Sequence, residues 1–209
     1  MTSINDGLLI VISGPSGVGK GTICKELLKR VTNIEYSVSA TTRRPRQGEI
    51  EGKDYFFYTE EAFKKLIQDD ELLEWAKIYD NYYGTPKKYV DDLLKQGKDC
   101  ILEIDVQGAM QIKAKKPEGI FIFILPPSRD ELVRRITCRG TENGEEIAKR
   151  MNKVNEELTH LPEYHYVVVN EDVDEAVSKV EAIITAERCR TERFSEFYEE
   201  VTKECTNLP

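Results

Sequence analysis

The sequence predicts an α/β fold in which helices flank a parallel β-sheet. Three observations carry this prediction: short apolar runs recur along the chain, stretches of helical periodicity separate them, and a glycine-rich turn follows the first run. Strands that alternate with helices in this way form parallel βαβ units. The chain has 209 residues and no Gly/Ser/Pro-rich linker, so we expect one domain, residues 1–209, with a sizeable core.

The predicted strands are continuous apolar runs, which is the pattern of a strand buried on both faces. In chain order they are Leu8–Ser13, Ile101–Asp105, Ile120–Leu125 and Tyr166–Val169.

Helices are predicted from periodicity and from capping residues. Thr22–Arg30 and Val173–Val201 have helical spacing of apolar residues, and in the second of these Phe194, Phe197, Tyr198 and Val201 form a stripe. That stripe is expected to pack against the domain or against a second subunit. Two further helix starts are marked by Thr59 before a pair of acids, and by the capping box Ser128–Glu131.

Composition excludes several classes of protein. The chain carries 30 Lys and Arg against 38 Asp and Glu, and this net charge of −8 argues against nonspecific nucleic-acid binding as the main activity. No apolar run approaches the roughly 20 residues that span a bilayer, and Met1–Gly7 lacks the features of a signal peptide. Five scattered cysteines without a C-x-x-C pair indicate reduced thiols and a cytoplasmic location, and two histidines offer little for a zinc site.

A glycine-rich loop directly follows the first predicted strand and opens a helix, which is the context of a phosphate-binding G-x-x-x-x-G-K loop. Its glycines let backbone N–H groups approach phosphate oxygens, and the helix dipole and Lys20 add positive charge. An ordinary strand-to-helix turn is the alternative, and the position of Lys20 favours phosphate binding. The residues expected to bind ATP are Gly14, Pro15, Ser16, Gly17, Val18, Gly19, Lys20, Gly21 and Thr22.

The loop departs from its usual pattern at one position. A Ser or Thr that ligates Mg²⁺ normally follows the lysine, whereas this chain has Gly21 and then Thr22. Thr22 is no simple replacement, because one step along a helix turns the side chain by roughly 100°. We therefore expect Mg²⁺ to be held mainly by nucleotide phosphates and water. The letters GKGT are similar to the loop of adenylate kinases and favour a nucleotide kinase over a regulatory GTPase.

A second phosphate site is predicted where Arg43, Arg44 and Arg46 form a positive patch in an acidic protein. Arginine forks bind phosphate oxygens through paired hydrogen bonds, although a solvated charge run is the usual alternative. The segments Glu74–Ala76 and Asn81–Thr85 follow at a distance suited to folding back over the patch.

Taken together, these motifs resemble the guanylate kinases from Leu8 to about Glu187. The motifs occur in the family's order: GPSGVGKGT, SATTRRPRQGE, GKDYFF, LLEWA, NYYGT, ILEIDVQG and RGTE with a downstream KR. The resemblance implies a P-loop kinase fold, the reaction ATP + GMP ⇌ ADP + GDP, and dGMP as a second acceptor. It implies a core of about 7–35, 87–127 and 163–190, a GMP-binding region of about 36–86, a helical lid of about 128–160, and a tail, 191–209, past the family match.

The resemblance also assigns roles to single residues. Arg43, Arg46, Tyr55 and Tyr83 are expected to clamp the GMP phosphate, and Ser39, Glu74 and Thr85 to read guanine, with Asp105 beside the base. A carboxylate such as Glu74 accepts from both N1–H and the 2-amino group of guanine, whereas adenine would leave the charge unpaired.

Phosphoryl transfer between nucleotides depends on positioning and on stabilising charge, so no catalytic histidine is required. Lys20, Arg43, Arg139 and Arg150 are the expected catalytic cations, and Arg135 also lies in the stretch that resembles the lid. Asp105 ends a Walker B-like strand and is expected either to orient a Mg²⁺-bound water or to contact guanine. Asn170 resembles the family's adenine-side residue.

Two other functions are consistent with parts of the sequence. Guanylate-kinase-like binding modules use the same face to hold phosphopeptides, but they typically lack an intact phosphate loop. A related P-loop kinase could act on AMP or on a sugar phosphate. The sequence leaves open whether the chain is a monomer or a homo-oligomer, and it indicates neither a nucleic-acid partner nor a membrane partner.

Overall fold

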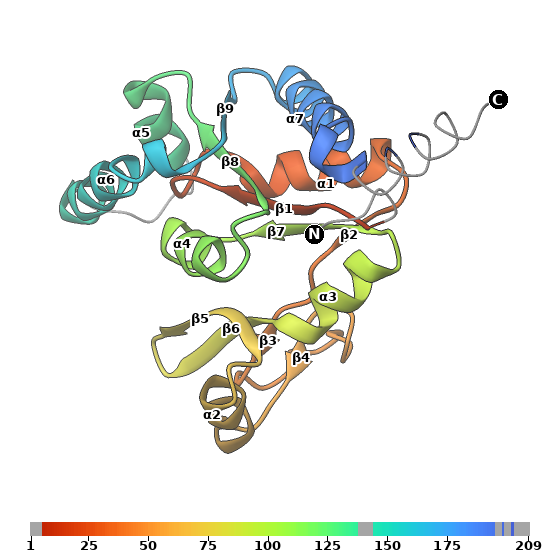
Figure 1. Ribbon diagram of the computed structural model, residues 1–209. Coiled ribbons are helices and arrows are strands. Elements are labelled where there is room, and N and C mark those ends of the chain that lie inside the picture. Colours follow the sequence, from red (N-terminus) through yellow and green to blue (C-terminus); the bar gives the residue numbers. More distant parts are fainter. Residues whose placement is uncertain (1–5, 138–143, 195–197, 199–201, 203–209) are drawn as a thin grey trace.

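The computed structural model describes residues 6–137, 144–194, 198 and 202, and for residues 144–149 it describes the backbone only. Its centre is a five-stranded parallel sheet in the order β2-β7-β1-β8-β9 (Figure 1). The strands are β1 Leu9–Ser13, β2 Ile34–Tyr36, β7 Asp99–Glu103, β8 Ile120–Leu125 and β9 Tyr166–Val169. The α/β prediction with a parallel sheet is therefore confirmed.

The apolar runs predicted four of the five strands of this sheet; β2 was not predicted, and the bounds of β7 need a correction. The sequence predicted a strand from Ile101 to Asp105, but the strand found there, β7, begins at Asp99 and ends at Glu103. Asp105 instead caps the next helix, since its side chain accepts from the backbone N–H of Gly108 at 2.8 Å. The capping bond turns the chain away from the sheet at that point.

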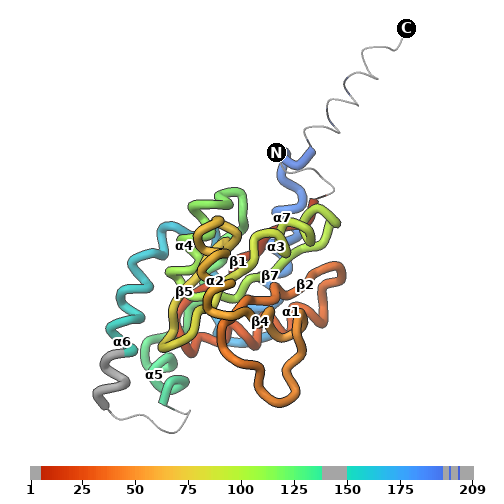
Figure 2. The backbone as a smooth tube through the Cα atoms, turned by 90° about the horizontal axis from the view of Figure 1, so that it is seen from below, coloured from red at the N-terminus to blue at the C-terminus, as the bar shows by residue number. Residues whose placement is uncertain are grey.

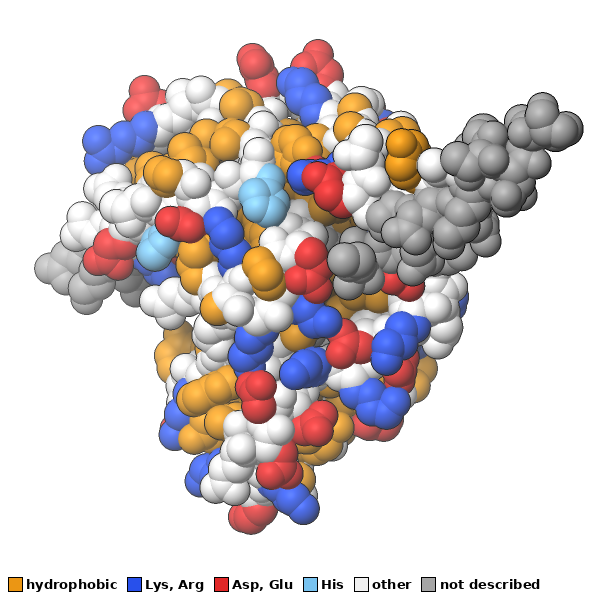
Figure 3. All heavy atoms as spheres, in the orientation of Figure 1, with side chains coloured by type: hydrophobic (Ala, Val, Ile, Leu, Met, Phe, Trp, Pro, Cys, Tyr) orange, Lys and Arg blue, Asp and Glu red, His pale blue; other side chains and the backbone are white. Residues whose placement is uncertain are grey.

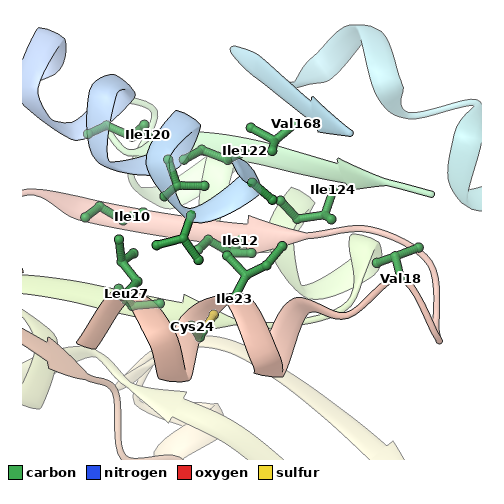
Figure 4. Packing of buried hydrophobic residues seen from close by; sticks show 14 of the residues in the cluster. Ile10, Ile12, Val18, Ile23, Cys24, Leu27, Ile120, Ile122, Ile124 and Val168 are labelled. Carbon is green, nitrogen blue, oxygen red and sulfur yellow. The ribbon is translucent and has the colours of Figure 1, made fainter. Parts of the chain in front are cut away.

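Helices cover both faces of the sheet (Figure 1). α1 (Lys20–Arg30) and α7 (Val173–Arg188) pack on one face, where Ile10, Ile12, Ile122 and Ile124 are fully buried (Figure 4). α3 (Lys87–Lys95) and α4 (Val106–Lys115) pack on the other face over Val11, Phe121 and Phe123. Alternate residues of β1 and β8 thus enter opposite cores, which is why these strands read as continuous apolar runs.

A second sheet has four strands in the order β4-β3-β6-β5 and lies below the first in the view of Figure 1. Its strands are β3 Ala40–Thr41, β4 Phe56–Phe57, β5 Leu72–Ile78 and β6 Asn81–Pro86, and β5 and β6 form an antiparallel hairpin. α2 (Glu60–Gln68) packs on this sheet through the fully buried Phe63. As predicted, α2 begins after Thr59, whose hydroxyl accepts from the backbone N–H of Ala62 at 3.2 Å.

Two further helices, α5 (Arg129–Thr137) and α6 (Gly144–Leu158), lie side by side at one end of the molecule (Figure 2). The predicted cap is present, because the Ser128 hydroxyl accepts from the backbone N–H of Glu131 at 3.1 Å. A capping box also requires the glutamate side chain to accept from the backbone N–H of Ser128. The described contacts of the Glu131 carboxylate are instead with Arg134 and Arg135. The short 3₁₀ helix η1 (Leu161–Glu163) leads from α6 to β9.

The prediction of one unbroken helix from Val173 to Val201 is wrong at residues 189–194, whereas Tyr198 is again helical. α7 ends at Arg188 with Cys189 as its C-cap, and a separate 3₁₀ helix η2 (Thr191–Phe194) follows. The break places Arg193 in a buried position where it donates to the backbone oxygen of Asp6. Of the predicted stripe, Phe197 and Val201 lie outside the described residues.

The surface carries both signs of charge in close alternation on the face shown in Figure 3. Many lysines and arginines of the described residues are paired with nearby carboxylates, for example Lys115 with Asp70 and Lys116 with Asp91. Within the described part of the chain, no helix is both long enough and apolar enough to cross a bilayer.

Candidate active site

The loop between β1 and α1 has the backbone geometry that its glycines predict. Gly14, Gly17 and Gly19 adopt φ values of 137°, 89° and 93°, which residues other than glycine rarely adopt. At Gly14 a Cβ atom would also lie 2.4 Å from the backbone oxygen of Ile124. α1 begins at Lys20 directly after this loop, so the helix N-terminus and the loop amides face the same space.

Lys20 bends back over the loop, where its ammonium group donates to the backbone oxygens of Gly14 and Pro15. Burial lowers the pKa of Lys20, and the nearby carboxylates of Glu103, Glu157 and Asp105 act in the opposite direction. The lysine therefore stands among acids that partly balance the cost of burying its charge. Glu157, on α6, is itself only 8% exposed.

Gly21 lies in the first turn of α1 against the carboxylate of Glu103. A Cβ atom at Gly21 would be 3.3 Å from each carboxylate oxygen. Glu103 ends β7, and its Oε2 accepts from the hydroxyl of Tyr36 on β2 at 2.7 Å. The position that usually carries a hydroxyl thus faces an acidic side chain in this chain.

Asn170 lies beneath the loop and supports its backbone. Its Nδ2 donates to the backbone oxygen of Val18 at 2.7 Å, and a Cβ atom at Gly19 would collide with that nitrogen at 2.4 Å. The side chain is 2% exposed, and its Oδ1 has no hydrogen-bond partner within the described ranges. The role expected for Asn170 was a contact with adenine, whereas its visible contacts brace the phosphate loop.

Two of the three predicted base-reading residues, Glu74 and Thr85, meet on the hairpin of the second sheet. The hydroxyl of Thr85, on β6, donates to Oε1 of Glu74, on β5, at 2.7 Å. A Cβ atom at Gly108 would lie 3.2 Å from Oε2 of Glu74 and 3.5 Å from Oδ1 of Asp105, so both carboxylates border the first turn of α4. Burial raises the pKa of Glu74 to about 7, and the charge of Asp105 adds to the rise against the Thr85 hydrogen bond.

The predicted phosphate clamp contains an acid that the sequence did not single out. Arg43 donates from both terminal nitrogens to the two carboxylate oxygens of Glu49, at 3.0 and 2.8 Å. Glu49 also accepts from the backbone N–H of Arg46 at 2.7 Å, which fixes the carboxylate to its own loop. The guanidinium carbon of Arg43 lies 5.3 Å from the ring centroid of Tyr55, and that ring packs edge-on to Tyr83 at 6.3 Å.

A pocket of about 220 Å³ opens between the two sheets. The predicted residues Ser39, Tyr55 and Thr85 line it together with Tyr36 and Glu103. It therefore joins the base-reading side of the second sheet to the strand that ends beside the phosphate loop.

Two arginines of the predicted lid, Arg150 and Arg135, lie within the described residues. Arg150, on α6, lines a small pocket with Ser16 of the loop and with Glu157. Arg135, on α5, binds Glu131 at 2.7 Å and the backbone oxygen of Asn170 at 3.1 Å. Arg139 lies outside the described residues.

Sequence reasoning missed Glu49, Tyr36, Glu103 and Gly108. Glu49 had a local signal, because it follows Arg46 by three residues across a glycine with a φ of 91°. Tyr36 and Glu103 are 67 positions apart, so only the pairing of β2 with β7 brings them together.

Comparison with known proteins agrees with this arrangement. Residues 7–187 match the family model described as guanylate kinase. A guanylate kinase from Caldanaerobacter subterraneus subsp. tengcongensis is 56% identical over 204 residues, which cover 98% of this chain and 99% of that protein. One from Halalkalibacterium halodurans is 54% identical over 94% of this chain and 97% of its own length.

Solved structures give the same result. The crystal structure of guanylate kinase from Anaplasma phagocytophilum superposes with a TM-score of 0.69 at 37% sequence identity, covering 90% of each chain. The family match spans the phosphate loop, both sheets and the helices around them. This chain belongs to the guanylate kinase family.

Proposed function

We propose that the protein transfers the γ-phosphoryl group of ATP to GMP, with the residues described above in the roles given below. Membership of the family makes the chain a nucleoside monophosphate kinase. The observation that carries the proposal is that the chain combines a glycine-rich phosphate loop with a Glu74–Thr85 pair. Thr85 lines the pocket between the sheets together with Glu103, and Glu103 borders the loop helix at Gly21.

ATP would bind with its β- and γ-phosphates in the loop. Lys20 already binds two loop carbonyl oxygens, so it can move to phosphate oxygens over a short path. Backbone N–H groups at the start of α1 would complete the cradle. Asn170 would keep the loop in shape from below through its bond to Val18.

GMP would occupy the pocket between the sheets. The ionised carboxylate of Glu74 would accept from N1–H and from the 2-amino group, while Thr85 and Ser39 complete the guanine contacts. Asp105 lies beside Glu74, which supports a place on the guanine side for this residue. Arg43, Arg46, Tyr55 and Tyr83 would hold the phosphate.

In the transfer step an oxygen of the GMP phosphate attacks the γ-phosphorus, and the bond to the β,γ-bridging oxygen breaks with its electron pair leaving on ADP. The attacking phosphate is already anionic near neutral pH, so no side chain has to remove a proton. Lys20, Arg43, Arg139 and Arg150 would stabilise the charge on the transferred group. Closure of residues 128–160 would exclude water and so limit hydrolysis of ATP.

Mg²⁺ fits this site as a hydrated ion that arrives with ATP, where it would neutralise phosphate charge. Among the described residues there is no cluster of three side chains suited to direct metal binding. Acids near Lys20 are nevertheless available to accept from metal-bound water. Buried free thiols at Cys24 and Cys100 are in keeping with a cytoplasmic location, which we propose on that ground.

A coupled assay of ADP release tests the proposal against its alternatives. GMP, dGMP, AMP, CMP and UMP are supplied in turn with MgATP, and we expect turnover with GMP and dGMP. Turnover with AMP or a sugar phosphate would assign another acceptor. Binding of GMP without ADP release from any acceptor would indicate a binding module.

A further inference from the structure

We propose that Gln111, on α4, is a positioning residue for guanine recognition, because its side-chain amide fixes the backbone next to Glu74. The Glu74 carboxylate is thereby aimed at two donors of the base, N1–H and the 2-amino group. This inference rests on the proposed function, because it concerns how Glu74 is held for the role given there. Gln111 acts through the backbone of β5 and not on the nucleotide.

The Gln111 amide completes the outer edge of β5. β5 is the last strand of its sheet, and α4 packs beside it (Figure 1). Oε1 of Gln111 accepts from the backbone N–H of Trp75 at 3.1 Å, and Nε2 donates to the backbone oxygen of Trp75, also at 3.1 Å. One side chain thus supplies the acceptor and the donor that a neighbouring strand would otherwise offer.

The pairing of β5 with β6 is irregular at Glu74. Leu72 lies opposite Pro86 of β6, whereas Trp75 lies opposite Gly84, so β5 has one residue more than β6 over this stretch. Glu74 lies within this bulge, where the ladder is disrupted and the strand bends. The hairpin alone therefore holds Glu74 less firmly than a regular ladder would.

α4 holds the bulge at both of its ends. Gly108, Gln111 and Lys115 lie on one face of the helix, because they are spaced by three and four residues. The ammonium group of Lys115 donates to the backbone oxygen of Leu72 at 2.6 Å, at the end of the bulge opposite to that held by Gln111. Gly108 leaves room for the carboxylate, since a Cβ atom there would lie 3.2 Å from Oε2 of Glu74.

The direction of the carboxylate decides how many bonds it makes to the base. The hydroxyl of Thr85 fixes Oε1 of Glu74 at 2.7 Å, and the backbone beside Gln111 then determines where Oε2 lies. Hydrogen bonds weaken steeply once donor and acceptor are misaligned. A shift of β5 would therefore weaken the paired contacts with N1–H and the 2-amino group.

The alternative is that Gln111 only joins the second sheet to the core. Such a structural role would change the affinity for every purine monophosphate by the same factor. The two roles separate in the base factor, which we define as the Kd for IMP divided by the Kd for GMP. IMP lacks only the 2-amino group, and titration calorimetry on the full-length protein measures both constants without any turnover.

In the wild-type protein we expect a base factor of about ten, the loss of one hydrogen bond to a charged acceptor. In Gln111→Met the factor should fall to about three or less, because a misaligned carboxylate gains little from the 2-amino group. Methionine has a similar length and helix propensity, so the helix is retained. Gln68→Met makes the same change at an exposed glutamine at the end of α2, and this matched control leaves the factor unchanged.

Thermal unfolding checks that each variant is folded. If Gln111→Met does not fold, Lys115→Met decides in its place, because it removes the bond to Leu72 at the other end of the bulge. The same fall in the base factor is then expected.

A wild-type base factor in folded Gln111→Met, or in Lys115→Met where that variant decides, would overturn the inference. An equal fall in Gln68→Met would overturn it as well. A wild-type protein that binds GMP no more tightly than IMP would instead refute the guanine-reading role of Glu74 in the proposed function.

Discussion

Replacing Glu74 by Gln is expected to make the ligand-free protein more stable while it loses GMP. Glu74 is half-buried and next to Asp105, and burial raises its pKa from an ordinary 4.5 to about 7. The folded protein then binds the proton more tightly than the unfolded chain does. The contribution of Glu74 to the free energy of unfolding therefore falls as pH rises from about 4.5 to about 7, and it is constant above that range.

The size of this effect follows from the shift. Each pKa unit corresponds to about 1.4 kcal/mol, so ionised Glu74 destabilises the free protein by at most about 3 kcal/mol above pH 7. Solvent that reaches the half-buried side chain reduces this figure. Gln mimics the protonated acid and can still accept from the Thr85 hydroxyl, so it recovers much of that free energy.

Binding should change in the opposite direction. Two hydrogen bonds from guanine to an ionised acceptor, at about 1.5 kcal/mol each, predict a rise of about 10²-fold in the Kd for GMP in Glu74→Gln. In the wild-type protein the Kd should also rise about tenfold per pH unit below pH 7, because only the ionised form accepts from both donors. In the variant, the pH dependence of the Kd for GMP should come only from the GMP phosphate, because the second pKa of a phosphate monoester is about 6.

Chemical denaturation measures the free energy of unfolding, and calorimetric titration measures the Kd for GMP. Both are carried out between about pH 5 and 8, the range in which Glu74 is expected to titrate. Asp105→Asn serves as a second variant that retains the Glu74 carboxylate. A Glu74→Gln protein that is less stable at pH 8, or one whose GMP affinity keeps a midpoint near 7, would refute the reasoning.

Three other substitutions test separate parts of the site. Lys20→Ala should lower kcat by about 10²–10³-fold with little change in the Kd for GMP, because Lys20 acts on the ATP phosphates; an equal loss of both would contradict this role. Asn170→Ala leaves the Val18 carbonyl unpaired, so a denaturant titration should show a free energy of unfolding lower by about 1–3 kcal/mol. The KM for ATP should rise while the KM for GMP stays the same. Glu49→Gln should raise the KM for GMP severalfold at nearly constant kcat, because Arg43 loses its paired acceptor; a lower KM would mean that Glu49 competes with the phosphate.

Much of the central sheet could be predicted because its strands are buried on both faces. β8 and β9 match their predicted runs residue for residue. For β8, every position of Ile120–Leu125 is apolar, a glycine precedes the run and a proline follows it. The phosphate loop was predictable for a related reason: its glycines and Lys20 are contiguous and require no tertiary contact to be recognised.

The remaining features depend on contacts between distant segments. The strands β3 and β4 have two residues each, too few for a periodic signal, and they are defined by pairing: β3 pairs with β6, and β4 pairs with β3. α7 ends at Arg188 although the helical pattern continues, and Arg188 there binds the buried Asp99, 89 positions away, a contact that the pattern does not indicate. The bond from Asn170 to Val18 spans 152 positions and is likewise invisible in the sequence.

The central claim is direct transfer of phosphate from ATP to GMP on this chain. ³¹P NMR of a mixture of the protein, MgATP and GMP tests it without coupling enzymes. We predict that the β-phosphate signals of ADP and GDP appear together in equal amounts, with no inorganic phosphate. Inorganic phosphate without GDP, or no change in the ATP signals, would contradict the account.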